Sequence, residues 1–414
     1  MERSILHCDC NGFYASVECV RDPSLRSVPM AVCGNPENRH GIILAKNEPA
    51  KKYGIRTAET VWSARNKCPE LVLVSPHRDL YMQYSKQVND IYKQYTDQVE
   101  PFGIDESWLD VTGSLTLFGS GKEIADTLRQ RIRSELGLTI SVGVSFNKVF
   151  AKLGSDYKKP DATTVIDAEN WQKIIFPLPA DTLLFVGRST REKLAALRVE
   201  TIGDLAASDK ELLFRHLGKI GAVLWEYANG LDDSPVAFAD TEQEIKSVGN
   251  SITFKRNLIN WEEVKIGLDV LSDSVAARMR KKGLKGTTVQ VAVKDTELKT
   301  VSRQKKLSSP SCISREISNT AMSLIRSFWP SGKPIRMLNV TCAGLLPADT
   351  VATELTLFDT PEELKKRDRL EKLEATLDKL RERYPDTAVR RAAQLENRGL
   401  GIESEETTDK DLPK

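Results

Sequence analysis

The sequence predicts an α+β protein of several domains, and three observations lead to this expectation. At 414 residues the chain is too long for a single hydrophobic core. Short apolar strands alternate with amphipathic helices up to about residue 166, and only short helices follow to about residue 240. A β-α-β-β-α-β order is then expected over residues 244–345, followed by a polar tail over residues 346–414.

Two of the expected strands contain acidic residues that could form a functional site. Residues 4–10 are expected to form an apolar strand interrupted by Asp9, and a second strand near residues 103–111 contains the adjacent acids Asp105 and Glu106. Neighbouring side chains on a strand point to opposite faces, and an unpaired buried carboxylate is costly. The pair therefore needs a cation or a tight turn, and the two alternatives are a Mg²⁺ site and a solvated hairpin tip.

Asp9 shifts the balance between these alternatives. Three carboxylates on two strands can hold two metal ions a few ångström apart. Such a pair of ions clamps the attacking and leaving oxygens of an in-line phosphoryl transfer. The sequence therefore favours a two-metal site.

The other elements follow from periodicity. A strand and a helix ended by Gly54 are expected over residues 41–55. Residues 183–205 are typical of a helix-hairpin-helix motif, whose turn at Gly187 binds a phosphate or simply joins two helices. The remaining expected helices cover residues 78–100, 123–136, 148–155, 261–282, 313–328 and 370–384, and the remaining strands cover residues 139–144, 246–254, 289–294, 300–307 and 337–343.

The charge is unevenly distributed along the chain. The formal net charge is only +2, but residues 246–345 hold 18 Lys and Arg against 7 Asp and Glu, a local excess of +11. A strongly basic segment in a near-neutral chain indicates contact with a phosphate backbone, and the alternative is a solvated basic face. The sequence therefore predicts nucleic-acid binding by this segment.

Cysteine usage and hydropathy indicate the compartment. The seven cysteines are odd in number and show no disulfide framework, which suits reduced thiols. Cys8 and Cys10 could ligate a metal, but no partner pair follows at zinc-finger spacing, so we expect buried strand thiols. No apolar run approaches the length of a membrane span and no signal peptide opens the chain, so a cytoplasmic protein is expected.

Several motifs in order resemble the Y-family, or lesion-bypass, DNA polymerases. The first runs from Asp9 through Asn11 and Phe13 to Glu18, and the second is Ile104 to Asp110. The match continues through residues 141–145 and 151–156 to Lys159 and Pro160, and it covers residues 1–347 with a short further match near residue 357. The chain resembles the bacterial polymerase IV type, with some residues similar to the polymerase V catalytic subunit.

The resemblance implies a domain plan and an activity. Residues 1–18 and 76–166 would form the palm, 19–75 the fingers, 167–240 the helical thumb, 244–345 the little finger, and 346–414 a tail. The implied activity is template-directed, low-fidelity translesion DNA synthesis in DNA repair and damage tolerance, without a recognisable proofreading domain. It requires primer–template DNA, deoxynucleoside triphosphates and two Mg²⁺ ions, and the protein is expected to act as a monomer.

The resemblance also assigns roles at the acids. Asp9 and Asp105 would bridge both metals, Glu106 would complete the ion beneath the primer 3′-hydroxyl, and the Cys10 backbone carbonyl would ligate the triphosphate-side metal. Tyr14 matches the steric-gate position that excludes a ribose 2′-hydroxyl, with a core aromatic as the alternative. Phe13 would line the sugar or base.

The implied nucleotide-binding lysines are Lys51 and Lys159. The fingers depart from the polymerase IV pattern, because Ala45, Glu48 and Lys51 stand where Thr, Tyr and Arg are usual. A lysine binds phosphate with less geometric definition than a bidentate arginine, and a surface lysine without this role is the alternative.

The implied DNA and clamp contacts lie in the second half of the chain. Backbone contacts are expected from Gly187, Lys246, Arg256, Arg303, Lys305 and Lys306. Residues 354–359 resemble the peptide that binds the bacterial sliding clamp, with Leu355, Leu357 and Phe358 as contacts, although Glu354 replaces the usual Gln. An apolar segment folded back on the body is the alternative.

Two other functions compete with a polymerase. A nucleotidyl transferase or cyclase on a related palm would have no use for a basic little finger or a clamp peptide. A non-catalytic, clamp-tethered DNA-binding protein with a silent palm would be compatible with the altered fingers residues.

Overall fold

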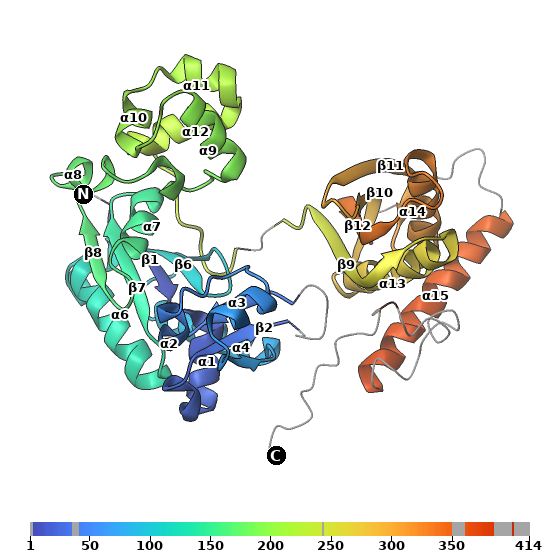
Figure 1. Cartoon of the computed structure of the whole chain (residues 1–414), viewed down its shortest axis with the longest axis horizontal. Helices are drawn as coiled ribbons and strands as arrows, with labels where there is room; N and C mark the ends of the chain where they lie inside the picture. Colours follow the sequence, from blue (N-terminus) through green and yellow to red (C-terminus); the bar gives the residue numbers. More distant parts are fainter. Residues whose placement is uncertain (1–2, 35–40, 242–243, 350–360, 385–399, 401–414) are drawn as a thin grey trace. The chain divides into compact units, whose positions relative to one another are not determined.

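The computed structural model describes residues 3–34, 41–241, 244–349, 361–384 and 400. The chain divides into two compact units, Met1–Glu242 and Gln243–Lys414 (Figure 1). In the described residues, no helix has the combination of length and apolar character needed to cross a membrane.

The first unit is built on a five-stranded sheet in the order β5-β6-β1-β7-β8. Its central strand β1 pairs antiparallel with β6 and β7, and β7 pairs parallel with β8. These strands are Ile5–Cys10 (β1), Val99–Pro101 (β5), Glu106–Asp110 (β6), Ile140–Ser145 (β7) and Thr163–Ile166 (β8). The mixed sheet confirms the expected alternation of strands and helices in this part of the chain.

Three helices cover one face of this sheet and a fourth lies on the other. Leu6 and Cys8 of β1 share a core with α4 (Arg78–Tyr92) and α6 (Gly121–Leu136), together with α1 (Phe13–Arg21). Helix α7 (Lys148–Tyr157) packs on β7 and β1 from the opposite face. The helix expected over residues 78–100 is too long, because it ends at Tyr92 and β5 follows.

A small three-stranded sheet follows α1 in the chain. Its order is β3-β2-β4, with the strands Met30–Cys33 (β2), Ile43–Lys46 (β3) and Val72–Val74 (β4). Helices α2 (Glu48–Lys52) and α3 (Val61–Lys67) complete it. Gly54 has a φ of +71°, but α2 ends before it, with Tyr53 as the C-cap.

The rest of the first unit is helical. Five short helices follow β8 and share one core: Trp171–Ile175 (α8), Arg188–Ala196 (α9), Ile202–Ala207 (α10), Lys210–Leu217 (α11) and Lys219–Ala228 (α12). Helices α9 and α10 form the expected helix-hairpin-helix pair. The chain then returns to the sheet, where Gln98 donates to the Val236 carbonyl and Ala239 N–H donates to the Asp97 carbonyl.

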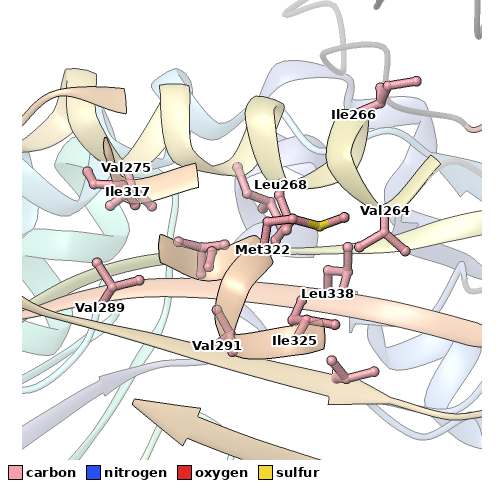
Figure 2. Close-up of a cluster of buried hydrophobic side chains, with 14 of the residues drawn as sticks. Val264, Ile266, Leu268, Val275, Val289, Val291, Ile317, Met322, Ile325 and Leu338 are labelled. Atoms are coloured by element: carbon pink, nitrogen blue, oxygen red, sulfur yellow. The ribbon is translucent and has the colours of Figure 1, made fainter. Parts of the chain in front are cut away.

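The second unit has the expected β-α-β-β-α-β order. Its four-stranded antiparallel sheet has the order β11-β10-β12-β9. The elements are Ser247–Leu258 (β9), Trp261–Lys281 (α13), Leu284–Lys294 (β10), Thr300–Ser311 (β11), Ser314–Phe328 (α14) and Ile335–Pro347 (β12). Figure 2 shows side chains such as Leu268, Met322, Val291 and Leu338 packed into its buried apolar core.

Helix α15 (Pro361–Arg383) lies against this second unit through charged side chains. The leucine seam of the expected helix is largely exposed, with Leu373 at 52% and Tyr384 at 57% exposure. The helix is therefore present as expected. Leu370 and Leu377 are half-buried, and the ion pairs with the body come from the face next to the leucines.

Candidate active site

The structure brings the three acids to neighbouring ends of two paired strands. Asp9 on β1 lies directly opposite Glu106 on β6 in the antiparallel register. Asp105 precedes β6, and its carbonyl accepts a hydrogen bond of 3.0 Å from the Cys10 backbone N–H. The expected meeting of acids from distant parts of the chain is thus present in the fold.

The pleat of the sheet separates the acids from the apolar core. Directly paired residues in an antiparallel ladder point to the same face. His7 pairs with Trp108 two positions away from Asp9 and Glu106, so these four side chains share one face of the sheet. Leu6 and its neighbours on the opposite face form the core with α4 and α6.

Helix α7 lies unusually close to this acid-bearing face. A Cβ on Gly143 of β7 would lie 1.8 Å from the Ala151 carbonyl oxygen and 2.5 Å from the Ser155 nitrogen. Only glycine permits this approach, because any other residue would push α7 away. The close packing brings Lys152 into contact with Glu106 and Ser155 into contact with His7.

Two lysines pair with the acids. Lys159 Nζ donates to Asp9 Oδ2 at 2.6 Å and lies 2.8 Å from Asp156 Oδ1. Lys152 pairs with Glu106. Nucleotide binding was predicted for Lys159 but not for Lys152, although Lys152 lies within the motif at residues 151–156.

His7 is the second residue that the sequence analysis missed. Its ring is fully buried, Nδ1 lies 2.8 Å from Ser155 Oγ, and Nε2 lies 3.3 Å from Glu106 Oε2. Burial lowers the pKa of His7, so its ring is neutral. The alternation of apolar and polar residues in β1 could have placed His7 on the face of Asp9.

Burial and neighbouring charges give the three carboxyl groups different pKa values. Burial raises the pKa of Asp9 to about 6, although Lys159 opposes it. Burial, followed by the Glu106 charge, also raises the pKa of Asp105. The adjacent His7 ring and the Lys152 ammonium hold the pKa of Glu106 at about 2. Two acids are therefore costly to ionise without a further cation, whereas Glu106 is ionised.

The donor chemistry fits a hard divalent cation. The three carboxylates supply oxygen ligands, and the raised pKa values of Asp9 and Asp105 show that these groups lack full charge compensation. In the described part of the chain, no three carboxylate, imidazole or thiol groups already converge as a closed metal cage. The side chains of Asp9 and Glu106 are directed to lysines instead.

An aromatic cluster lies beside the acids at the start of α1. Phe13 is buried, and Tyr14 is partly exposed. The Tyr14 ring stacks on Tyr81 of α4, with centroids 4.3 Å apart and an interplanar angle of 13°. Gly12 starts the helix with a φ of +54°, which glycine adopts without strain. The sequence analysis did not identify Tyr81.

The residues expected to form the fingers divide into structural and exposed groups. Asn47 is the N-cap of α2: its Oδ1 accepts from Ala50 N–H, and its Nδ2 donates to the carbonyls of Leu25 and Val28. Lys51 pairs with Glu48 at 2.5 Å, and both side chains are exposed. Lys51 is thus accessible to a ligand, whereas the Asn47 side chain is committed to the local fold.

The expected DNA contacts fall on two surfaces of the second unit and one of the first. Gly187 is the exposed N-cap of α9, with no side-chain cap. In the second unit, Lys246, Arg256, Arg303, Lys305 and Lys306 are all exposed. Arg256 pairs with Glu263 of α13 at 2.7 Å, and Arg303 lies over the Phe328 ring of α14 at 5.5 Å.

The strand register places the basic residues of β11 on different sides of the sheet. Lys305 pairs with the buried Val289, so it points to the side covered by the helices, whereas Lys306 pairs with Thr288 on the open side. Other open-side positions carry amides and hydroxyls that the sequence analysis did not select: Gln290, Gln304, Asn339 and Thr341. The clamp residues Leu355, Leu357 and Phe358 lie outside the described residues.

Comparisons with known proteins agree with this architecture. Residues 8–156 match the model of the impB/mucB/samB family, and residues 245–355 match the model of that family's C-terminal domain. A DNA polymerase IV of Acetivibrio thermocellus is 52% identical over 400 residues, covering 97% of this chain and 99% of the relative. A DNA polymerase IV of Moorella thermoacetica is 39% identical, covering 96% and 97% of the two chains.

A solved structure extends the comparison to the fold. A Y-family DNA polymerase chimera has a TM-score of 0.74 to this chain at 22% identity, and the match covers 83% of this chain and 99% of that one. At this identity the likeness shows the fold alone. The α+β multidomain fold expected from the sequence is therefore confirmed.

Proposed function

This chain belongs to the impB/mucB/samB family of Y-family DNA polymerases, of the DNA polymerase IV type, and we propose that β1 and β6 carry its catalytic centre. The family makes it a DNA-directed DNA polymerase of translesion synthesis. The observation that carries the assignment of the site is the register of Asp9 opposite Glu106, with Asp105 beside Cys10. Neither the comparisons nor the intact acids favour a silent palm.

Asp9, Asp105 and Glu106 would hold the divalent metal ions, with the backbone carbonyl of Cys10 as a further oxygen ligand on the triphosphate side. Two Mg²⁺ ions bound there would lower the pKa of the primer hydroxyl and neutralise charge on the departing pyrophosphate. The buried, incompletely compensated carboxyl groups of Asp9 and Asp105 support this assignment.

The reaction joins the primer to the incoming nucleotide. The primer 3′-hydroxyl loses its proton to solvent and its oxygen forms a bond to the α-phosphorus. The bond from that phosphorus to the oxygen bridging to the β-phosphate breaks, and pyrophosphate leaves with the electron pair. Lys159, which is beside Asp9, and the exposed Lys51 would bind the triphosphate. Phe13 would line the sugar or the base, and the Tyr14 ring would exclude a nucleotide that carries a 2′-hydroxyl.

The DNA would be held by backbone contacts on both units. The uncapped start of α9 at Gly187 offers backbone N–H groups to a phosphate. In the second unit, Lys246, Arg256, Arg303, Lys305 and Lys306 supply positive charge, and the polar open face of the sheet supplies hydroxyls and amides. Such contacts bind without sequence preference, as a general polymerase requires.

The tail suggests a further partner, and the cysteines indicate the compartment. Residues 354–359 would bind the sliding clamp through Leu355, Leu357 and Phe358, and the enzyme would act as a monomer. All seven cysteines are free and buried, which suits the reducing cytoplasm. The domain limits expected from the sequence complete the proposal: palm 1–18 and 76–166, fingers 19–75, thumb 167–240, little finger 244–345.

Primer extension tests the assignment of the acids. Asp105→Ala is expected to slow extension on an undamaged template by more than about a hundredfold, the loss that even an outer partner of a catalytic metal can cause. Its affinity for primer–template DNA should stay within about twofold of wild type, because the phosphate contacts lie elsewhere. Asp97→Asn, an exposed carboxylate in the loop before β5, is the matched control.

Three outcomes are informative. If Asp105→Ala extends primers as fast as the wild type, the acid assignment is wrong. Equal slowing by Asp97→Asn would attribute the effect to charge or folding. If the wild type itself does not extend primers, the non-catalytic DNA-binding alternative gains.

A further inference from the structure

A buried carboxylate lies one helical turn beyond the proposed steric gate. Tyr14 and Glu18 occupy the same side of α1, because residues four apart on a helix are neighbours. Tyr81 of α4 contacts both: its ring stacks on Tyr14, and its hydroxyl donates to Glu18 Oε1 at 2.5 Å. We propose that Glu18 is a positioning residue that fixes the Tyr14 ring through Tyr81 and so sets the preference for deoxyribonucleotides.

Glu18 is held from several sides. It is 1% exposed, and the same Oε1 that accepts from Tyr81 lies 2.8 Å from His77 Nδ1. Arg21 Nη1 lies 2.9 Å from His77 Nε2 and 3.2 Å from His77 Nδ1, so the guanidinium, the imidazole ring and the Glu18 carboxylate form one contiguous group. Arg21 also lies 3.6 Å from the other carboxylate oxygen. A buried carboxylate with these partners has a fixed position.

The hydrogen bond from Tyr81 to Glu18 matters because stacking alone does not fix the position of the Tyr81 ring. Two parallel rings slide over each other at little cost, whereas a hydrogen bond at the ring edge fixes rotation and displacement in the plane. Tyr81 is fully buried and its hydroxyl is bound, so its ring presents a fixed plane to Tyr14. Exclusion of one hydroxyl group requires the gate to be held within about half an ångström.

This inference rests on the proposed role of Tyr14 as the gate. A purely structural role for Glu18 would lower the amount of folded enzyme, which affects all nucleotides equally. A positioning role changes the ratio of kcat/KM for a deoxyribonucleotide to kcat/KM for the matching ribonucleotide. This ratio is measured within one enzyme preparation and does not depend on the folded fraction.

The experiment measures this ratio opposite one template base for the wild type and a set of variants. Tyr81→Phe keeps the stacked ring and removes only the hydroxyl. Glu18→Gln keeps an oxygen that accepts from Tyr81 and His77, whereas Glu18→Ala does not. Tyr92→Phe is the matched control, because Tyr92 is also buried on α4 but its hydroxyl interacts with the Cys8 thiol and not with Glu18.

We expect Tyr81→Phe and Glu18→Ala to lower the ratio by roughly ten- to a hundredfold, the factor that corresponds to one lost hydrogen bond to a charged group. The double variant should show the loss of either single variant, because both remove the same interaction. Tyr92→Phe should stay within about twofold of the wild type. Glu18→Gln keeps a neutral acceptor in place of the charged one, so it should lower the ratio by less than Glu18→Ala does.

Tyr14→Ala separates the possible failures. If this variant leaves the ratio unchanged, Tyr14 is not the gate, and the proposed gate and the inference both fail. If Tyr14→Ala lowers the ratio but Tyr81→Phe and Glu18→Ala do not, the gate stands and the positioning role of Glu18 is overturned. An equal effect of Tyr92→Phe would also overturn it.

Discussion

At the scale of single residues, the catalytic face is dominated by the cost of burying charge. Asp9 is 7% exposed, and its nearest cation is the Lys159 ammonium, which also pairs with Asp156. One ammonium shared between two carboxylates compensates neither fully. Burial therefore outweighs the ion pair and raises the pKa of Asp9 to about 6.

This shift predicts a pH dependence of stability in the metal-free enzyme. The folded-state pKa of Asp9 lies above its ordinary value of 3.8, so the folded state binds more protons than the unfolded state between these values. Stability is then lost as the pH rises through this window. Relative to Asp9→Asn, the wild type should lose up to about 3 kcal/mol between about pH 4 and about pH 7.

Denaturant unfolding of both proteins with a chelator, at the two pH values, measures this difference. Addition of Mg²⁺ at the higher pH should restore the wild type and leave Asp9→Asn unchanged, because only the wild type keeps the full set of ligands. A difference between the proteins that stays constant with pH would contradict the raised pKa.

The residues that the sequence predicted and those that it missed differ in a physical respect. Asp9, Asp105 and Glu106 are costly acids in apolar strands, so local sequence alone marks them. His7 and Lys152 act through contacts that only the close approach of α7 to Gly143 creates. Tyr81 meets Tyr14 across two helices that are distant in the chain, and no spacing rule connects them.

At the scale of elements, α15 shows how a helix can dock through its charged side. Glu374 is 7% exposed and pairs with Arg280 of α13, which also donates to Asp378 at 2.6 Å. Both Glu374 oxygens lie 3.0 Å from the Ser314 backbone nitrogen at the start of α14. The carboxylate thus satisfies a helix N-terminus and a buried guanidinium together.

Breaking this cluster should destabilise the second unit. Glu374→Ala removes one carboxylate from the partly buried Arg280, which keeps Asp378, and leaves the Ser314 backbone N–H without its acceptor; we expect a loss of about 1–3 kcal/mol. Lys372→Ala is the matched control on the same helix, because its pair with Asp368 is exposed and contributes less than about 0.5 kcal/mol. Denaturant unfolding of the full chain, followed by hydrogen exchange in α14, measures the change.

Equal protection of α14 in Glu374→Ala and in the wild type would show that α15 is not part of the stable unit.

The amphipathic leucine pattern predicted the helix but not this mode of docking, because charged residues are normally assigned to the solvent face. The ends of the helices and strands were predicted less well than their presence. The helix expected to reach residue 100 ends at Tyr92, since Val99–Pro101 pairs with β6 instead.

At the scale of the whole molecule, the proposed catalytic acids and the basic segment belong to different parts of the chain. The acids lie in the first unit, whereas the excess of +11 lies in residues 246–345 of the second. Charge patterning and the β-α-β-β-α-β order made this division predictable from the sequence. The side of the sheet on which each basic residue lies depends on register, which the sequence did not reveal.

The separation predicts that attachment to the sliding clamp can be removed without loss of catalysis. Leu357→Ala with Phe358→Ala should weaken clamp binding by about tenfold or more, since two apolar anchors of a short peptide are lost. Clamp-dependent product length should fall, while extension without the clamp should match the wild type because the acids are untouched. Leu373→Ala, an exposed leucine of α15, is the matched control. Loss of both activities in the double variant would instead show that residues 354–359 fold against the body, and the clamp assignment would fail.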